Sequence, residues 1–130
     1  MIEIIVVSHG TLSESLVKSA ELIAGEVDNV KAFGLHAGDD IDKFKAIIEE
    51  AIKKGTEESS VLVLTDLMYG TPFNVVSSLM DKYKFHHITG INLPIYLEIV
   101  TSRKIMGIDE LCKTIKEIGP TSFVYINEII

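Results

Sequence analysis

The sequence predicts an α/β protein, an open three-layer sandwich in which helices cover both faces of a mainly parallel sheet. Two observations predict this class. Short β-branched apolar runs alternate with longer segments of helical periodicity along almost the whole chain, and such alternation with short connections is typical of parallel sheets. The length of 130 residues lies near the commonest domain size. We therefore expect one domain, residues 1–130.

Four strands are expected from short apolar runs that end in polar or glycine-containing loops. They span residues 2–7, 30–35, 60–65 and 86–91. A sheet whose order begins 2-1-3-4 places the first and third strands side by side, so that the loops following them meet at the topological switch point.

Helices are expected at residues 12–24, 41–54, after Pro72, 95–104 and 108–118. Their apolar residues recur at helical spacing, which predicts one core-facing stripe on each helix. In the first two helices the stripes are Leu12, Leu16, Ala20 and Ile23, and Phe44, Ile47, Ile48 and Ala51.

Residues that favour helix ends flank these segments. Thr11 and Glu14 have the spacing of a capping box, and Asp40 precedes the second helix. Gly55 is expected to end the second helix, and Thr71 to be the N-cap of the third helix with Pro72 at its first position.

The final run, residues 122–130, is β-rich and breaks the alternation, because no crossover follows it. Two interpretations are open. The run forms an ordinary edge strand on its own sheet, or it pairs with the sheet of a second subunit.

Composition narrows the function classes. The net charge of −7 and the lack of a large Lys/Arg cluster argue against a nucleic-acid partner. The single cysteine fits a reducing cytoplasm, and no apolar stretch reaches the roughly 20 residues that span a bilayer. We expect a cytoplasmic protein with no basic signal-peptide region, no metal site and no cofactor.

His9 follows the first strand in Ser8-His9-Gly10, and Asp66 follows the third strand in the same way. The strand order above makes these residues neighbours, although they are far apart in sequence. An imidazole titrates near neutral pH and can act as a nucleophile there. The helix start at Thr71 supplies free amides and a dipole that favour an anion. This combination predicts chemistry at a phosphoryl group.

Structural alternatives exist for each of these residues. His9 could be a loop histidine without a functional role, and Asp66 could be an aspartate that stabilises a turn. Met68, Tyr69 and Phe73 could form an apolar docking rim or be buried. His86 and His87, at the start of the fourth strand, are expected to be structural, because they lie at the wrong end of that strand for the site.

Three segments together resemble the enzyme IIA domains of the mannose-type phosphoenolpyruvate-dependent sugar phosphotransferase system. They are Ser8-His9-Gly10, Asp66 to Asn74, and Gly90-Ile91-Asn92-Leu93-Pro94. The order and spacing of the segments fit along essentially the whole chain, which is more specific than Ser-His-Gly alone.

The resemblance implies a phosphocarrier in which His9 accepts a phosphoryl group from phospho-HPr, as tele-phosphohistidine, and donates it to enzyme IIB. The membrane components IIC and IID are then only indirect partners. It also implies a homodimer in which an antiparallel last strand is exchanged between subunits. Asp66 would orient His9 through the other ring nitrogen and stabilise its developing charge. The expected phosphoryl-binding residues are Leu67, Met68, Gly70 and Thr71, and the expected partner or site-lining residues are Ser8, Gly10, Phe73 and Asn92.

Two other functions remain open from the sequence. One is the phosphocarrier subunit of a dihydroxyacetone kinase, which shares the architecture and the strand-end histidine. The other is a non-enzymatic flavodoxin-like module that binds a nucleotide or flavin. The chain contains neither a Gly-rich dinucleotide fingerprint nor a Walker loop, so the module is the weaker alternative.

Overall fold

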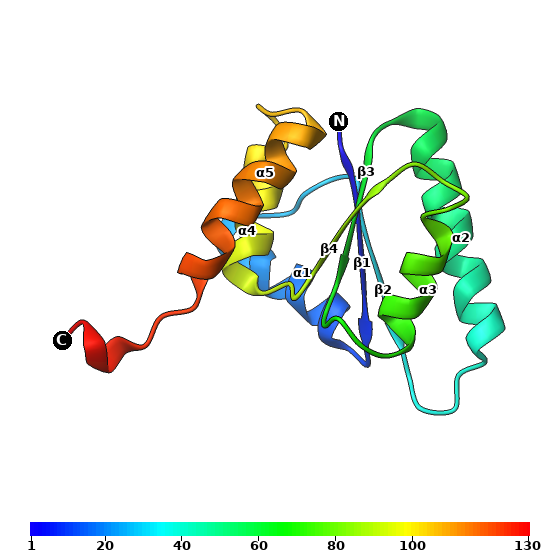
Figure 1. The fold of residues 1–130 in the computed structure, drawn as a ribbon, viewed down its shortest axis with the longest axis horizontal. Helices are drawn as coiled ribbons and strands as arrows, with labels where there is room; N and C mark the ends of the chain where they lie inside the picture. Colours follow the sequence, from blue (N-terminus) through cyan, green and yellow to red (C-terminus); the bar gives the residue numbers. More distant parts are fainter.

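A computed structural model describes residues 1–130 and contains one four-stranded sheet flanked by five helices (Figure 1). The strands are β1 (Glu3–His9), β2 (Val30–Leu35), β3 (Val61–Thr65) and β4 (His86–Thr89). The helices are α1 (Leu12–Ala24), α2 (Ile41–Glu58), α3 (Thr71–Leu79), α4 (Leu93–Ser102) and α5 (Ile108–Ile118). Two short 3₁₀ turns follow, at Gly119–Ser122 and Ile126–Glu128. None of the helices has the length and apolar character needed to cross a membrane.

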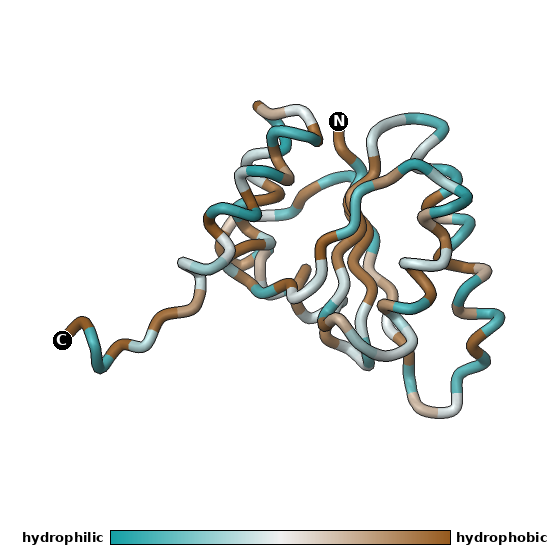
Figure 2. The backbone as a smooth tube through the Cα atoms, in the orientation of Figure 1, coloured by the Kyte–Doolittle hydropathy of each residue, from teal (hydrophilic) through white to brown (hydrophobic).

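The sheet has the predicted order β2-β1-β3-β4, and every neighbouring pair of strands is parallel. Helices α1, α4 and α5 cover one face, whereas α2 and α3 cover the other (Figure 1). The central strands are apolar on both faces, as buried parallel strands are, and they form the brown centre of Figure 2. The predicted three-layer class is confirmed.

The two helix stripes are partly wrong. Leu16 and Ala20 are buried as expected, whereas Leu12 and Ile23 at the two ends of α1 are exposed. Ile47 of α2 is also exposed, with 54 % of its surface accessible. These positions lie at the margins of the helix faces that the sheet covers, where an apolar side chain remains in contact with solvent.

Gly55 does not end α2, contrary to expectation, because the helix continues to Glu58. The glycine is buried, and a β-carbon added there would lie 2.7 Å from Val61 Cγ2. The position therefore needs a small residue so that α2 can pack closely against β3, and glycine is used here for space rather than for a turn.

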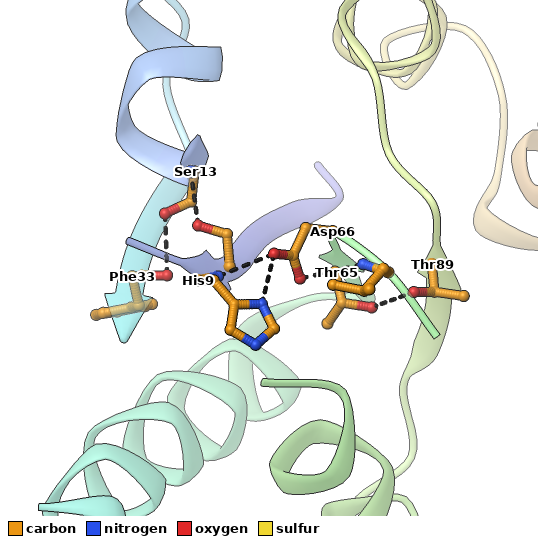
Figure 3. A network of polar contacts seen from close by, with 8 residues as sticks. His9, Ser13, Phe33, Thr65, Asp66 and Thr89 are labelled. Carbon is orange, nitrogen blue, oxygen red and sulfur yellow. Dashed lines mark hydrogen bonds and ion pairs between the residues drawn. The ribbon is translucent and has the colours of Figure 1, made fainter. Parts of the chain in front are cut away.

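One of the two predicted caps of α1 and α2 also differs. Thr11 is the N-cap of α1, but its side chain makes no capping hydrogen bond. The buried Ser8 hydroxyl instead accepts from the Ser13 amide at 2.8 Å, and the Ser13 hydroxyl donates to the Phe33 carbonyl at 2.9 Å (Figure 3). Asp40 is a true cap, whose carboxylate accepts from the Lys43 amide.

The terminal run 122–130 forms no strand within the single chain, so the interpretation as an edge strand on its own sheet is wrong for this chain alone. It leaves α5 and projects away from the body (Figure 1). Its apolar side chains are exposed; they are Phe123, Val124, Tyr125, Ile126, Ile129 and Ile130. In Figure 2 the arm carries several brown segments. Pairing with a second subunit is not tested by the single chain.

Candidate active site

His9 and Asp66 meet at the carboxyl edge of the sheet, as predicted. The His9 Nδ1 atom lies 2.8 Å from Asp66 Oδ2, and the His9 backbone amide donates to the same oxygen at 3.0 Å (Figure 3). The His9 side chain is 49 % exposed, whereas that of Asp66 is only 8 % exposed. A shielded carboxylate therefore holds one nitrogen of a half-exposed imidazole.

The strand register explains this contact. Val7 of β1 pairs with Thr65 of β3, so His9 lies two residues and Asp66 one residue beyond this pair. His9 ends β1, and Asp66 is the residue directly after β3. Asp66 also accepts from the Leu67 amide through Oδ1 at 3.1 Å. Both carboxylate oxygens thus have donors, which limits the repulsion that this carboxylate exerts on an approaching anion.

The residues beside His9 shape the scaffold. Ser8 is 1 % exposed and supports the start of α1, so it does not line the surface of the site. Gly10 has a φ of +54° and donates its amide to the Leu35 carbonyl of β2 at 2.7 Å. Asn92 caps α4 and donates to the Ser122 hydroxyl. Its hydrogen bonds belong to the fold rather than to His9 or Asp66.

Gly70 forms the wall of the site opposite Asp66. A β-carbon added at Gly70 would lie 2.8 Å from His9 Nε2 and 2.9 Å from its Cε1. The residue has a φ of +88° and a ψ of 179°, a region that only glycine adopts without strain. Gly70 therefore lets the backbone approach the ring nitrogen that Asp66 does not hold.

We predict that Gly70→Ala displaces the His9 ring and lowers the free energy of unfolding by roughly 1–3 kcal/mol, the cost of this backbone strain. Gly38→Ala is the matched control, since Gly38 has a φ of +84° but open space around its β-carbon position. In ¹H–¹⁵N NMR spectra, the His9 ring signals should shift in Gly70→Ala and stay unchanged in Gly38→Ala. Unchanged His9 signals in both variants would contradict the proposed close approach.

Helix α3 begins beside this wall, with one correction to the prediction. Gly70 is the N-cap, and Thr71 is the first helical residue rather than the cap. Backbone amides from Met68 to Thr71 donate no hydrogen bond within the chain, whereas that of Leu67 is used by Asp66. Free amides at a helix start attract anions. The available donors of the predicted phosphoryl-binding set are therefore those of Met68, Gly70 and Thr71, together with Tyr69.

The loop between Asp66 and Gly70 is apolar at its tip. Met68 and Tyr69 are 62 % and 75 % exposed, and Leu67 is also exposed. Phe73, in the first turn of α3, is half-buried, and its ring lies 5.3 Å from the ring of His87. Of the two alternatives for these side chains, exposure at the rim holds for Met68 and Tyr69, whereas Phe73 packs inward.

His87 lies at the start of β4, as expected, but its ring contacts the end of β3 beside Asp66. Strand β4 begins at His86 and ends at Thr89, two residues before the expected end. The His87 Nε2 atom lies 2.7 Å from Thr65 Oγ1, next to Asp66 in sequence. The alternation of His87 and Thr89 on one face of the strand could have indicated this polar contact.

Burial lowers the pKa of His87 from 6.5 to about 4. The unfolded chain therefore binds more protons than the folded chain between these values, so folding stability decreases as the pH falls from about 6.5 towards about 4. We predict that the urea midpoint of the parent falls more steeply between pH 7 and pH 5 than that of His87→Gln. Other groups titrate in both proteins, so parallel curves would contradict a depressed pKa at His87.

The chain is similar to known proteins along most of its length. The family model described as the PTS system fructose IIA component matches residues 3–116. The chain is 31% identical over 129 residues to the fructose-specific EIIA component of Bacillus subtilis, covering 98% of this chain and 88% of the relative. It is 29% identical over 120 residues to the sorbose-specific EIIA component of Klebsiella pneumoniae, covering 92% of this chain and 87% of the relative.

Solved structures give the same family. A phosphotransferase system component EIIA from Streptococcus agalactiae superposes with a TM-score of 0.90 at 31% identity, covering 98% of this chain and 99% of that one. A mannose/sorbose-specific IIA subunit from Enterococcus faecalis superposes with a TM-score of 0.84 at 29% identity, covering 95% and 92%. The family match over most of the chain, together with the shared fold, shows that this protein belongs to the mannose-type family of phosphotransferase system enzyme IIA components.

Proposed function

We propose that this protein is the phosphocarrier of a sugar phosphotransferase system and that Nε2 of His9 carries the phosphoryl group. One observation supports this most directly: Asp66 holds Nδ1 at 2.8 Å, while the ring remains 49 % exposed. If the neutral ring keeps its proton on Nδ1, that proton is donated to the carboxylate and Nε2 has a free lone pair. The carboxylate thus selects the nucleophilic nitrogen.

The transfer is a direct exchange between nitrogen atoms. The Nε2 lone pair of His9 attacks the phosphorus of a phosphohistidine donor, the donor's P–N bond breaks, and its electron pair returns to the donor ring. The His9 ring then gains cationic character, which the nearby Asp66 carboxylate stabilises. Donation to the next protein reverses these steps, so the protein mainly aligns the reacting atoms and stabilises charge.

The loop after Asp66 supplies the donors for the phosphoryl oxygens. The amides of Met68 to Thr71 have no partner within the chain, and the start of α3 directs its dipole to the same place. The absence of a β-carbon at Gly70 leaves room beside His9 Nε2. These amides can neutralise phosphoryl charge without a metal ion or a cationic side chain.

The donor in this proposal is phospho-HPr and the acceptor is an enzyme IIB, both in the cytoplasm. The exposed rim of Met68 and Tyr69 next to His9 offers apolar area for docking of these proteins. The related proteins from Bacillus subtilis and Klebsiella pneumoniae are named for fructose and sorbose, which are different sugars. We therefore propose that this chain carries out the transfer step and that its partners determine which sugar is phosphorylated.

The test is phosphorylation of the purified chain by phosphoenolpyruvate, enzyme I and HPr, followed by intact mass spectrometry. We expect a gain of one phosphoryl group that is labile to acid and resistant to base. Addition of an enzyme IIB should then remove the group, whereas a dihydroxyacetone kinase subunit should not. No mass gain would refute the proposed function, and transfer only to the kinase subunit would replace the acceptor.

We also propose that the chain works as a homodimer through its terminal arm, residues 123–130. Strand β4 is an edge of the sheet, and a groove of about 460 Å³ lies along it between β4, α4 and α5. The groove is lined largely by apolar side chains, among them Ile88, Ile91 and Ile115. The arm carries exposed apolar residues and finds no partner in its own chain. An arm from a second copy, paired antiparallel with β4, would cover both the free edge of β4 and the groove beside it.

Removal of residues 123–130 should convert the dimer to a monomer, which sedimentation velocity measures directly. The arm lies outside the core, so the truncated chain should keep its circular dichroism spectrum. Val124→Asp and Ile126→Asp together provide a full-length variant that weakens the same contact. A monomeric parent, or a truncated chain that stays dimeric, would contradict the exchange of this arm.

A further inference from the structure

The loop that carries the site has few contacts of its own. It starts at Asp66 and ends at Gly70, and Leu67, Met68 and Tyr69 between them are exposed. Its only side-chain hydrogen bonds join Asp66 to His9 and to the Leu67 amide. The positions of Asp66 and Gly70 relative to His9 must therefore be set by the two segments to which the loop is joined, the end of β3 and the first turn of α3.

His87 contacts both of these segments. Its Nε2 atom lies 2.7 Å from Oγ1 of Thr65, the last residue of β3. On the other side, its ring centroid lies 5.3 Å from that of Phe73 in the first turn of α3, with the rings tilted by 40°. One imidazole on β4 thus connects the two ends of the loop that carries Asp66 and Gly70.

Thr65 transmits this contact because it is fixed from several directions. It is fully buried, and its hydroxyl donates to Thr89 Oγ1 at 2.8 Å (Figure 3). Its carbonyl accepts from the amides of Gly90 and Ile91 at 3.1 Å and 3.2 Å. These bonds tie β3 to the end of β4 one residue before Asp66, so a displacement of Thr65 also displaces the carboxylate.

The hydrogen bond to Thr65 occupies one nitrogen of the His87 ring. The His87 Nε2 atom lies 2.7 Å from Thr65 Oγ1, which is also hydrogen-bonded to Thr89 Oγ1 at 2.8 Å. Burial keeps the pKa of His87 at about 4, so the ring is neutral at neutral pH and adds no positive charge behind the site. With Nε2 occupied, His87 does not compete with His9 for a phosphoryl group.

We propose that His87 is a positioning residue for phosphoryl transfer at His9, acting through Thr65 and Phe73 to hold Asp66 and the start of α3 at their places around the His9 ring. This proposal rests on the proposed function. Misplacement of reacting groups by about 1 Å costs on the order of a hundredfold in rate. Loss of His87 relaxes the loop rather than removing a reacting group, so the expected loss of rate is smaller, about tenfold.

The test compares His87→Leu, which removes both contacts, with His87→Gln, which keeps an N–H donor near Thr65. His86→Gln is the matched control, because His86 is the adjacent residue on β4 and bonds only to the exposed Asp109 at 3.1 Å. Thr65→Val breaks the same hydrogen bond from its other end and serves if His87→Leu does not fold. The rate of transfer from saturating phospho-HPr and the KM for phospho-HPr are measured for each variant.

We expect His87→Leu and Thr65→Val to lose about tenfold in the saturated rate with an unchanged KM. We expect His87→Gln to recover most of the rate and His86→Gln to match the parent. NMR of the unphosphorylated variants should show a shifted His9 Nδ1–H signal in His87→Leu and Thr65→Val but not in His86→Gln, which tests the inference even if no chain accepts a phosphoryl group. A folded His87→Leu with unchanged His9 signals, or with the parent rate, would overturn it.

Discussion

We expect His9→Ala to abolish phosphorylation of the chain: under conditions in which the parent gains one phosphoryl group, the mass of the variant should stay unchanged. The reason is geometric, since His9 has one nitrogen held by Asp66 at 2.8 Å and the other beside Gly70 at an exposed edge. None of the other histidines has this arrangement. His87 Nε2 is bonded to Thr65, and His86 Nε2 to Asp109.

The matched control is His36→Ala. His36 follows β2, is exposed and lies at the same edge of the sheet. Its hydrogen bond to the Asp39 carboxylate is donated by its backbone amide and not by its ring. We expect the parent mass gain in this variant. Full phosphorylation of His9→Ala, or loss of phosphorylation in His36→Ala with His9 intact, would assign the acceptor to another residue.

We expect Arg103→Met to lower the free energy of unfolding by roughly 3 kcal/mol, because several buried carbonyls lose a charged donor. Arg103 is 4 % exposed at the opposite edge of the sheet from His9. Its guanidinium donates to the carbonyls of Ile2 and Asn29 at 2.9 Å and 3.0 Å and also to that of Asp28. These carbonyls precede β1 and β2, so one side chain joins both strand starts to the end of α4.

Methionine fills a similar volume without a donor, so the variant isolates the hydrogen bonds from the packing. The neighbouring Lys104 is exposed, and Lys104→Met is the control, with a change within about 0.5 kcal/mol. Urea unfolding measures both values. Because the site lies at the other edge of the sheet, phosphorylation of folded Arg103→Met should match the parent. A change in the free energy of unfolding of Arg103→Met as small as that of Lys104→Met would contradict the claim that Arg103 joins the strand starts to α4.

The central part of the fold could be predicted because β1 and β3 each carry a buried apolar run. The strand order then follows from packing rules for parallel sheets, and that order alone brought His9 and Asp66 together across the sheet. The two residues lie at the carboxyl ends of neighbouring parallel strands, and their side chains are 2.8 Å apart.

The misjudged features depend on tertiary contacts that no local pattern encodes. A glycine at position 55 predicts a helix end, but α2 continues past it. Gly55 is needed there because a larger residue would clash with Val61. The cap of α1 comes from Ser8 on the preceding strand rather than from Thr11. His87 lies at the start of β4, as expected, but its contact with Thr65 depends on the packing of β4 beside β3.

The terminal run shows a different limit. Its alternation favours a strand, but a strand needs a neighbour, and the single chain provides none for residues 123–130. Its conformation is therefore a property of the assembly, which neither local propensity nor the structure of one chain specifies.

The central claim is that the phosphoryl group resides on Nε2 of His9, and ³¹P-coupled ¹H–¹⁵N NMR of the phosphorylated protein tests it most directly. We expect phosphorus coupling at Nε2 and a proton retained on Nδ1, in contact with Asp66. Coupling at Nδ1, or at any residue other than His9, would contradict the account, because Asp66 would then face the nitrogen that reacts instead of the one that it holds.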